Sequence, residues 1–268
     1  MTVTYDDVTK ARETQSKVIR NTTLEFSETF SKICGANVYL KNEYEQKTGS
    51  FKIRGAYYKI KSLTDEEKNK GVVAASAGNH SQGVALASHI ENIPCTIVMP
   101  KTASPAKVAA TKGYGANVVL VGSTYDESWA HAQKIALETN ATIIHAFDDS
   151  HVIAGQGVIG LEIIEQLPNV DEIYVPIGGG GLIAGIITAV KEKNPNVKII
   201  GVESSAYPAM KKSLENNTLE TVSGDTTIAD GISVKTPGKL TFEIVKQKID
   251  KIVTVDDSDI INAMFLLM

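Results

Sequence analysis

The sequence has little cysteine and no long apolar run. Its 268 residues include two cysteines, Cys34 and Cys95, which are too few for a disulfide framework. No segment reaches the ~18 to 20 consecutive apolar residues of a membrane-spanning helix. The polar N-terminus also lacks the apolar core of a signal peptide. These absences favour a cytoplasmic protein that has no membrane partner.

The sequence also lacks any block of like charge, and its formal net charge is -4. Nothing in this balance favours nucleic acid as a partner. No nucleophile elbow, CxxC pair or Walker A motif is present. Four histidines do not have the spacing of metal ligands and are expected to be structural: His89, His131, His145 and His151.

Short apolar runs alternate with helical patterns along most of the chain, which predicts an α/β fold with parallel sheets. The expected strands are 37–43, 72–76, 95–100, 117–122, 142–146, 172–177, 197–203 and 251–257. The expected helices are 51–63, 81–90, 106–112, 128–138 and 182–193. The composition marks no domain boundary.

Lys52 lies in the first of three segments that could carry chemistry, Lys47 to Gly55. A lysine amine is a nucleophile only when it is deprotonated, and burial or cationic neighbours favour that state. Lys52 is flanked by Phe51 and Ile53. The alternative is a solvated lysine in the first turn of a helix, which is the common case.

The second segment runs from Ser76 to Gly83, between an expected strand and an expected helix. Ligands of open α/β sheets bind at the carboxyl ends of the strands, where this loop must lie. Its N–H groups and the helix N-terminus suit a carboxylate or another anion. The alternative is a turn in which Gly, Asn and Ser only satisfy local capping.

The third segment, Gly178 to Gly181, follows a strand and begins a helix. Consecutive glycines let backbone N–H groups surround a phosphate closely, here without a cationic side chain among them. Two alternatives remain at this point. The pattern Gly179-x-Gly181-x-x-Ala184, with Glu203 ending the next strand, also fits a dinucleotide site. The glycines could also be purely structural.

Taken together, the motifs SFKxRG (50–55), SAGNHxQG (76–83) and GGGGLIAG (178–185) resemble those of fold-type II pyridoxal-phosphate enzymes. The similarity is specifically to the threonine dehydratase and serine racemase family, and it extends over nearly the whole chain. It disfavours a nicotinamide-dependent oxidoreductase, which would not need the other two motifs. The resemblance implies two open, twisted, mostly parallel sheets flanked by helices. It also implies a large domain (1–42 plus 144–268) and a small domain (43–143).

The resemblance further implies a role for each motif residue. Lys52 would hold pyridoxal 5'-phosphate as a Schiff base and move the α-proton of the substrate. Phe51 and Gly231 would line the cofactor ring, and Asn79 would bind its phenolic oxygen. The phosphate would lie on the amides of Gly178, Gly179, Gly180, Gly181 and Leu182. The substrate carboxylate would lie on Ser76, Ala77, Gly78, Asn79 and His80.

The activity that this resemblance implies is dehydration and deamination of L-threonine, and of L-serine, to 2-oxobutanoate or pyruvate and ammonia. Serine racemisation is the alternative, although racemising relatives have a serine at the position of Ala77. A homo-oligomer, dimer or tetramer, is expected. The resemblance also implies a nucleotide effector, with Lys47 and Thr48 as the place to look.

Two features depart from the family pattern. No residue after Gly231 matches the Ser or Cys that contacts the pyridine nitrogen, and 260–268 is an uncapped apolar helical pattern. We therefore expect residues beyond 268 to be needed for full activity. Some relatives bind a divalent cation through two acids, but here Glu203 is followed by Ala209 at the second position, so no metal is expected. A surface glycine such as Gly224 is expected to tolerate replacement better than Gly180.

Overall fold

Two parallel sheets form the framework of the computed structural model, which describes residues 2–267. One sheet has the strand order β5-β4-β3-β6 and the other has the order β7-β8-β9. The strands are β3 (Val72–Ala75), β4 (Cys95–Met99), β5 (Asn117–Leu120), β6 (Thr142–Ile143), β7 (Glu172–Pro176), β8 (Lys198–Ser204) and β9 (Lys251–Val255). These strands fall within the predicted segments except at Ser204, where β8 extends one residue beyond the predicted 197–203, and the predicted α/β class is confirmed.

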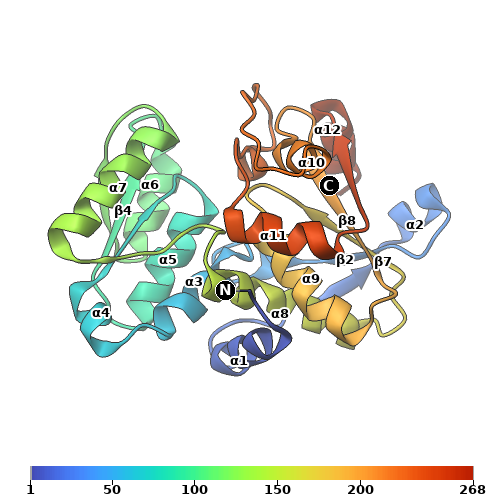
Figure 1. Cartoon of the computed structure of the whole chain (residues 1–268), viewed down its shortest axis with the longest axis horizontal. Coiled ribbons are helices and arrows are strands. Elements are labelled where there is room, and N and C mark those ends of the chain that lie inside the picture. The colour runs from blue at the N-terminus through green and yellow to red at the C-terminus, as the bar shows by residue number, and fades with distance from the viewer. Residues whose placement is uncertain (1, 268) are drawn as a thin grey trace.

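The helices surround the two sheets in two lobes, which Figure 1 shows side by side. Helices α4 to α7 accompany the first sheet and α9 to α12 accompany the second. The helices are α1 (Tyr5–Gln15), α2 (Glu28–Cys34), α3 (Lys52–Lys61), α4 (Asp65–Lys70), α5 (Asn79–Ile90), α6 (Pro105–Gly113), α7 (Tyr125–Thr139), α8 (Ser150–Gln166), α9 (Gly181–Lys193), α10 (Ala209–Glu215), α11 (Lys239–Lys248) and α12 (Asp257–Leu267). Single 3-10 turns, η1 and η2, lie at Glu43–Glu45 and Asp230–Ile232.

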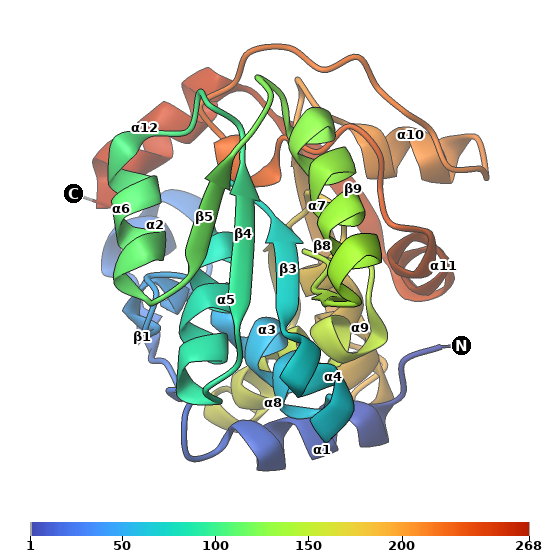
Figure 2. The ribbon, with the colours of Figure 1, turned by 90° about the vertical axis from the view of Figure 1, so that its left-hand side faces the viewer.

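The first sheet is buried on both faces. Along β3, Val72 and Ala74 pack into the core that includes α3 and α5, whereas Val73 and Ala75 pack against α7. Figure 2 shows β3, β4 and β5 pointing the same way between these helices. Burial on both faces explains why the sequence here is a continuous apolar run rather than an alternating one.

The predicted strand 37–43 does not join either parallel sheet. Its central part, β2 (Tyr39–Lys41), pairs antiparallel with β1 (Leu24–Phe26), a strand that the sequence analysis missed. The connection between them contains α2, which ends at Gly35 with φ of 65°. The left-handed conformation of Gly35 ends the helix and turns the chain. The chain then runs back along β1, so that β2 pairs with it in the antiparallel direction.

Helix α8 lies at the centre of the molecule, and all its residues from Val152 to Ile163 are buried. Its glycines allow neighbouring helices to touch backbone to backbone. A Cβ on Gly155 would lie 2.7 Å from the Cα of Gly55 in α3, and one on Gly157 would lie 2.8 Å from the Gly185 carbonyl in α9. This packing fixes the start of α3 relative to the start of α9, and both starts carry predicted site residues.

A buried ionic network also holds α3 in place. The guanidinium of Arg54 is fully buried and forms bidentate hydrogen bonds with Glu43 and with Glu162 at 2.7 to 2.9 Å. Glu162 also pairs with the amine of Lys41 at 2.7 Å. Two cations, Arg54 and Lys41, therefore balance the two carboxylates of this network. Arg54 lies only two residues after Lys52, so the network fixes the start of α3.

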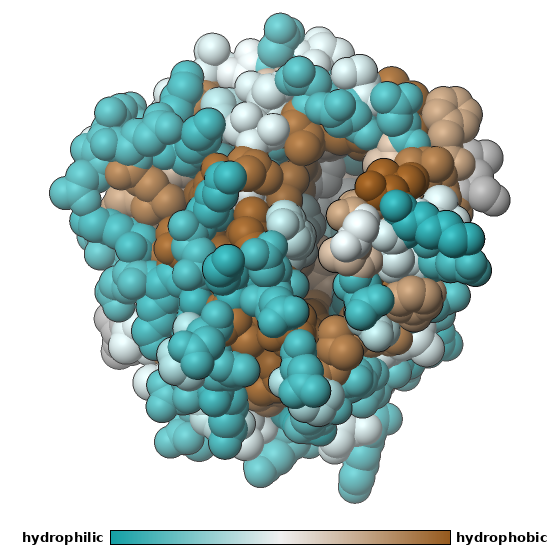
Figure 3. Space-filling view, turned by 90° about the vertical axis from the view of Figure 1, so that its right-hand side faces the viewer, coloured by the Kyte–Doolittle hydropathy of each residue, from teal (hydrophilic) through white to brown (hydrophobic). Residues whose placement is uncertain are grey.

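The face in Figure 3 carries apolar patches among polar side chains. On residues 24–41, which we call the arm, Phe26 and Ile33 are exposed, and Tyr39 packs edge-on against Phe26. Tyr174 on β7 is 63% exposed. Within residues 2–267, no helix combines the length and apolarity that crossing a membrane requires.

Candidate functional site

Lys52 is the first residue of α3, and its amine points at the segment that follows β6. The Nζ atom donates a hydrogen bond to the Ala146 carbonyl at 2.9 Å and lies 5.3 Å from the centroid of the Phe51 ring. Burial lowers the pKa of Lys52 to about 8. Lys52 is therefore not the solvated lysine of the alternative interpretation, because its amine loses its proton far more easily than an exposed one.

The segment from Ser76 to His80 follows the carboxyl end of β3, as predicted, but its last two residues, Asn79 and His80, already form the start of α5, two residues before the predicted helix start. The Ser76 hydroxyl accepts the N–H of Gly78 at 3.2 Å, which closes a local turn. No acceptor among residues 2–267 takes the N–H groups of Ala77, Asn79 and His80. The loop therefore offers a set of free donors at the positive end of a helix, which suits a carboxylate.

The ring of His80 has a structural role and is not one of the groups that this segment offers to a ligand. It is buried, and its Nε2 donates to the Ile144 carbonyl at 2.9 Å. Burial lowers the pKa of His80 to about 3, with a further contribution from Lys52, so the ring is neutral. His80 can therefore reach a substrate through its backbone N–H.

The four glycines Gly178 to Gly181 connect β7 to α9, again as predicted. No side chain caps α9, and no acceptor among residues 2–267 takes the N–H groups from Gly178 to Ile183. We call this run of free amides the cradle. Its residues, of which Gly178 and Leu182 are partly exposed, carry no charge.

The surrounding protein also requires glycine in the cradle, and the sequence analysis did not foresee this. A Cβ on Gly179 would lie 2.3 Å from the ring of Phe147, and one on Gly178 would lie 3.1 Å from the Cα of Ile232. Gly180 has φ of 94°, and its Cβ would meet Met210 and Thr241. The glycines thus serve close packing as well as free N–H groups.

The contact between Gly178 and Ile232 brings the predicted ring-lining residue Gly231 to the edge of the cradle. Gly231 lies in the 3-10 turn Asp230–Ile232, is exposed, and has open space where a side chain would be. Asp230 reaches across to Lys107 on α6 at 2.7 Å, so this turn touches both lobes.

These residues fit pyridoxal phosphate. Free amides without a protein acceptor can hold its phosphate, and the buried amine of Lys52 can bond to its aldehyde carbon. The hydroxyl of Ser50, two residues before Lys52, is buried without a hydrogen-bond partner among residues 2–267. It is a further polar group on the same segment that the sequence analysis did not single out.

Glu203 is fully buried at the end of β8, where its carboxylate accepts the N–H groups of Met210 and Lys211 at 2.8 and 2.9 Å. Burial outweighs these hydrogen bonds and raises the pKa of Glu203 to about 7. No cluster of three metal-ligating side chains is found within residues 2–267.

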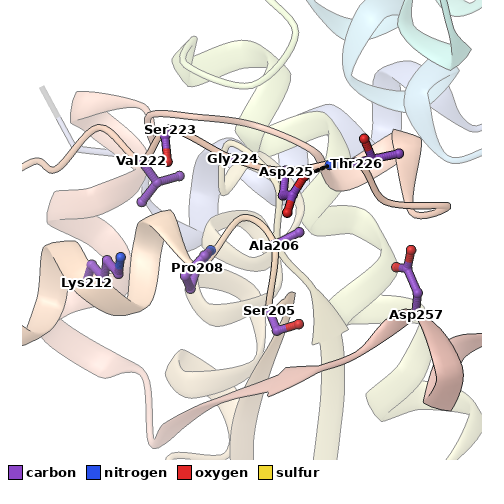
Figure 4. A pocket seen from close by; sticks show the side chains of 10 residues that line it. All are labelled: Ser205, Ala206, Pro208, Lys212, Val222, Ser223, Gly224, Asp225, Thr226 and Asp257. Carbon is purple, nitrogen blue, oxygen red and sulfur yellow. Dashed lines mark hydrogen bonds between the residues drawn. The ribbon is translucent and has the colours of Figure 1, made fainter.

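A hollow of about 550 Å³ is lined by residues that follow β8 in the sequence and by none of the predicted site residues. Figure 4 shows its lining, which includes Lys212 on α10, Asp225 and Asp257. The expectation for Gly224 in this lining was wrong. Its φ is 73°, and a Cβ would lie 2.1 Å from the ring of Tyr207 beneath it.

The segment from Ala146 to Asp148 touches several parts of the site, although no sequence motif marks it. Ala146 accepts from Lys52, and the Phe147 ring packs on Gly179. The Asp148 carboxylate accepts N–H groups at the start of α11. None of these residues belongs to a glycine-rich or lysine motif, so no local pattern marked them.

Comparison with known proteins places this arrangement in a family. The chain is 50% identical over 266 residues to the L-threonine ammonia-lyase of Thermotoga maritima, covering 99% of this chain and 66% of that protein. The structure of maize serine racemase matches with a TM-score of 0.96 and 34% identity, covering 99% of this chain and 80% of that one.

Threonine deaminase isoform 2 from Solanum lycopersicum matches with a TM-score of 0.93 and 40% identity, over 98% of this chain and 78% of that one. The chain thus spans only 66% to 80% of the length of these three proteins. The family model described as "Pyridoxal-phosphate dependent enzyme" matches residues 15–268. The chain belongs to the pyridoxal-phosphate dependent enzymes.

Proposed function

We propose that this protein dehydrates and deaminates L-threonine, and also L-serine, to 2-oxobutanoate or pyruvate and ammonia. The observation that carries the proposal is the Lys52 amine, whose pKa is lowered to about 8 by burial, in a chain 50% identical to an L-threonine ammonia-lyase. Such a lysine can both bond to the cofactor and carry a proton near neutral pH.

The residues of the chain divide the work between binding and proton transfer. The cradle would hold the cofactor phosphate, and Phe51 and Gly231 would lie beside its ring. Asn79 would bind the phenolic oxygen. Bound pyridoxal phosphate supplies an electron sink for the charge that is left when the α-proton departs. Lys52 would take that proton at Nζ, because it is the amine tied to the cofactor.

The loop from Ser76 to His80 would hold the substrate carboxylate through the free N–H groups of Ala77, Asn79 and His80. These donors lie just before α5 and in its first turn, and α5 packs directly on the start of α3. A Cβ on Gly83 would lie 3.0 Å from the backbone of Lys52. This contact would set the distance between the carboxylate donors and the reacting amine, which is how orientation contributes to the rate.

Serine racemisation is the second candidate, and the similarity to maize serine racemase favours it. Racemisation needs a second acid on the face opposite Lys52, and racemising relatives have a serine where this chain has Ala77. A methyl group has no proton to donate, and general acid–base assistance is typically worth ~10²–10⁴-fold in rate. Ala77 therefore favours elimination.

The test measures 2-oxobutanoate release from L-threonine by the purified, cofactor-loaded chain. Wild type and Lys70→Ala, which changes an exposed lysine paired with Glu66, should both be active. Lys52→Ala should release no 2-oxobutanoate above background. A folded, cofactor-loaded wild type that leaves L-threonine unchanged would refute the proposed activity.

Several finer points remain proposals. A homo-oligomer is supported by the exposed apolar side chains of the arm and of Tyr174. A nucleotide effector near Lys47 and Thr48, the boundaries of the small domain at 43–143 and a cytoplasmic location stay predictions. Size-exclusion chromatography with light scattering tests the first of these directly.

A further inference from the structure

The carbonyl of Gly179, inside the cradle, is held by two donors from α11. The hydroxyl of Thr241 lies 2.6 Å from this carbonyl and 3.0 Å from that of Gly238, so its one hydrogen is donated to the nearer Gly179 carbonyl. The N–H of Gly238 donates to the same carbonyl at 3.1 Å. Thr241 is fully buried, and its side chain lies against Gly180. This carbonyl is therefore fixed from the side of α11.

Fixing one carbonyl also fixes the next amide. A trans peptide group is planar, with its C=O and the following N–H pointing in opposite directions, and no peptide bond among the described residues is cis. When the Gly179 carbonyl points at α11, the Gly180 N–H must point away from α11. Gly180 is the residue with φ of 94°, a conformation that glycine adopts readily because it has no Cβ.

The donors are themselves held by Asp148. Its carboxylate accepts the N–H groups of Lys239 at 3.0 Å and Leu240 at 2.8 Å, at the start of α11. A Cβ on Gly238 would lie 2.4 Å from this carboxylate, so only glycine fits there. Asp148 thus anchors the turn that carries both donors to Gly179.

We propose that Thr241 is a positioning residue for the cofactor phosphate: its hydroxyl orients the Gly179–Gly180 peptide so that the Gly180 N–H faces the phosphate. The inference rests on the proposed function of the cradle. It assigns to α11 a part in cofactor binding that none of the three sequence motifs contains. Thr241 acts through the backbone and does not touch the phosphate.

The test compares dissociation constants for pyridoxal phosphate and for pyridoxal, which lacks the phosphate, on chains freed of cofactor. Thr241→Val keeps the shape of the side chain and removes the hydroxyl, and Thr241→Ser restores a hydroxyl. Thr188→Val is the matched control, because the buried Thr188 hydroxyl donates to the Ala184 carbonyl at 2.9 Å away from the cradle. Thr241→Ala replaces the valine variant if that variant does not fold.

Thr241→Val should weaken pyridoxal phosphate about three- to tenfold, the range expected for one lost hydrogen bond. Its affinity for pyridoxal should stay within about twofold of wild type, and Thr241→Ser and Thr188→Val should bind both compounds like wild type. Equal affinity of Thr241→Val and wild type for pyridoxal phosphate would overturn the inference. So would an equal loss for both compounds. A wild type that binds no pyridoxal phosphate would instead overturn the proposed function itself, and this inference with it.

Discussion

Replacing Arg54 with methionine is expected to destabilise the fold strongly. Arg54 is fully buried and its guanidinium binds two carboxylates, those of Glu43 and Glu162. Methionine has similar length but offers no donor. The change leaves Glu162, with a 5% exposed side chain, paired only with Lys41. Glu43 keeps the hydroxyl of Thr22 at 2.6 Å but loses its guanidinium.

The magnitude follows from this loss of partners. Removing one partner of a buried ion pair typically costs about 3–5 kcal/mol, because a charge remains buried without compensation. Lys41 still compensates the charge of Glu162 after the substitution. The free energy of unfolding should therefore fall by about 3–5 kcal/mol, and not by the sum for two broken ion pairs. Arg54→Lys should recover only part of this, because an ammonium cannot bind two carboxylates in a bidentate fashion.

Urea denaturation followed by far-ultraviolet circular dichroism measures the change. Arg12→Met is the matched control, because Arg12 also forms a bidentate pair, with Glu165, but the two side chains are 41% and 50% exposed. Exposed pairs contribute roughly 0 to 1 kcal/mol. If Arg54→Met costs no more than Arg12→Met, then the buried network does not hold α3 in the way described.

Three further predictions concern the site. The rate of covalent attachment of pyridoxal phosphate to the cofactor-free chain should rise as pH passes through about 8, the lowered pKa of Lys52. If the rate instead rises around the ordinary pKa of a lysine, the amine is solvated and the reasoning is wrong. Ala77→Ser should raise the ratio of D-serine to pyruvate formed from L-serine in deuterated water, and an unchanged ratio would remove this residue from the choice of reaction. Gly180→Val should weaken cofactor binding and lower the melting temperature, because φ is 94° there and Met210 lies against it. Gly113→Ala, which places its Cβ in open space, should change neither cofactor affinity nor melting temperature. If Gly113→Ala and Gly180→Val have similar effects, close packing is not the reason for glycine at position 180.

The sequence predicted the parallel strands because their signal is local. Strand β3 and its neighbours are apolar runs bounded by turn residues, and helices cover both faces of their sheet. Strand β1 was missed because Leu24–Phe26 is three residues long and largely exposed, so no apolar run marks it. Helix α8 was missed for the opposite reason. It is buried on all sides from Val152 to Ile163 and contains Gly155, Gly157 and Gly160, so it shows neither an amphipathic stripe nor strong helix propensity.

The candidate site divides in the same way. Lys52, Asn79 and the cradle glycines belong to contiguous motifs, and the sequence predicted them. Asp148 lies 31 residues before Gly179 in the sequence, and Thr241, which donates to the Gly179 carbonyl, lies 62 residues after it. Each looks like an ordinary capping or helix residue by itself. Their part in the site comes from tertiary contacts, which a single sequence does not reveal.

The most direct test of the account is to find the lysine that carries the cofactor. The loaded protein is reduced with borohydride, digested, and its peptides are mapped by mass spectrometry. The account predicts a single pyridoxyl group on Lys52, in the peptide that contains Phe51 and Ile53. A pyridoxyl group on Lys41, Lys47 or any other lysine, with Lys52 unmodified, would contradict it.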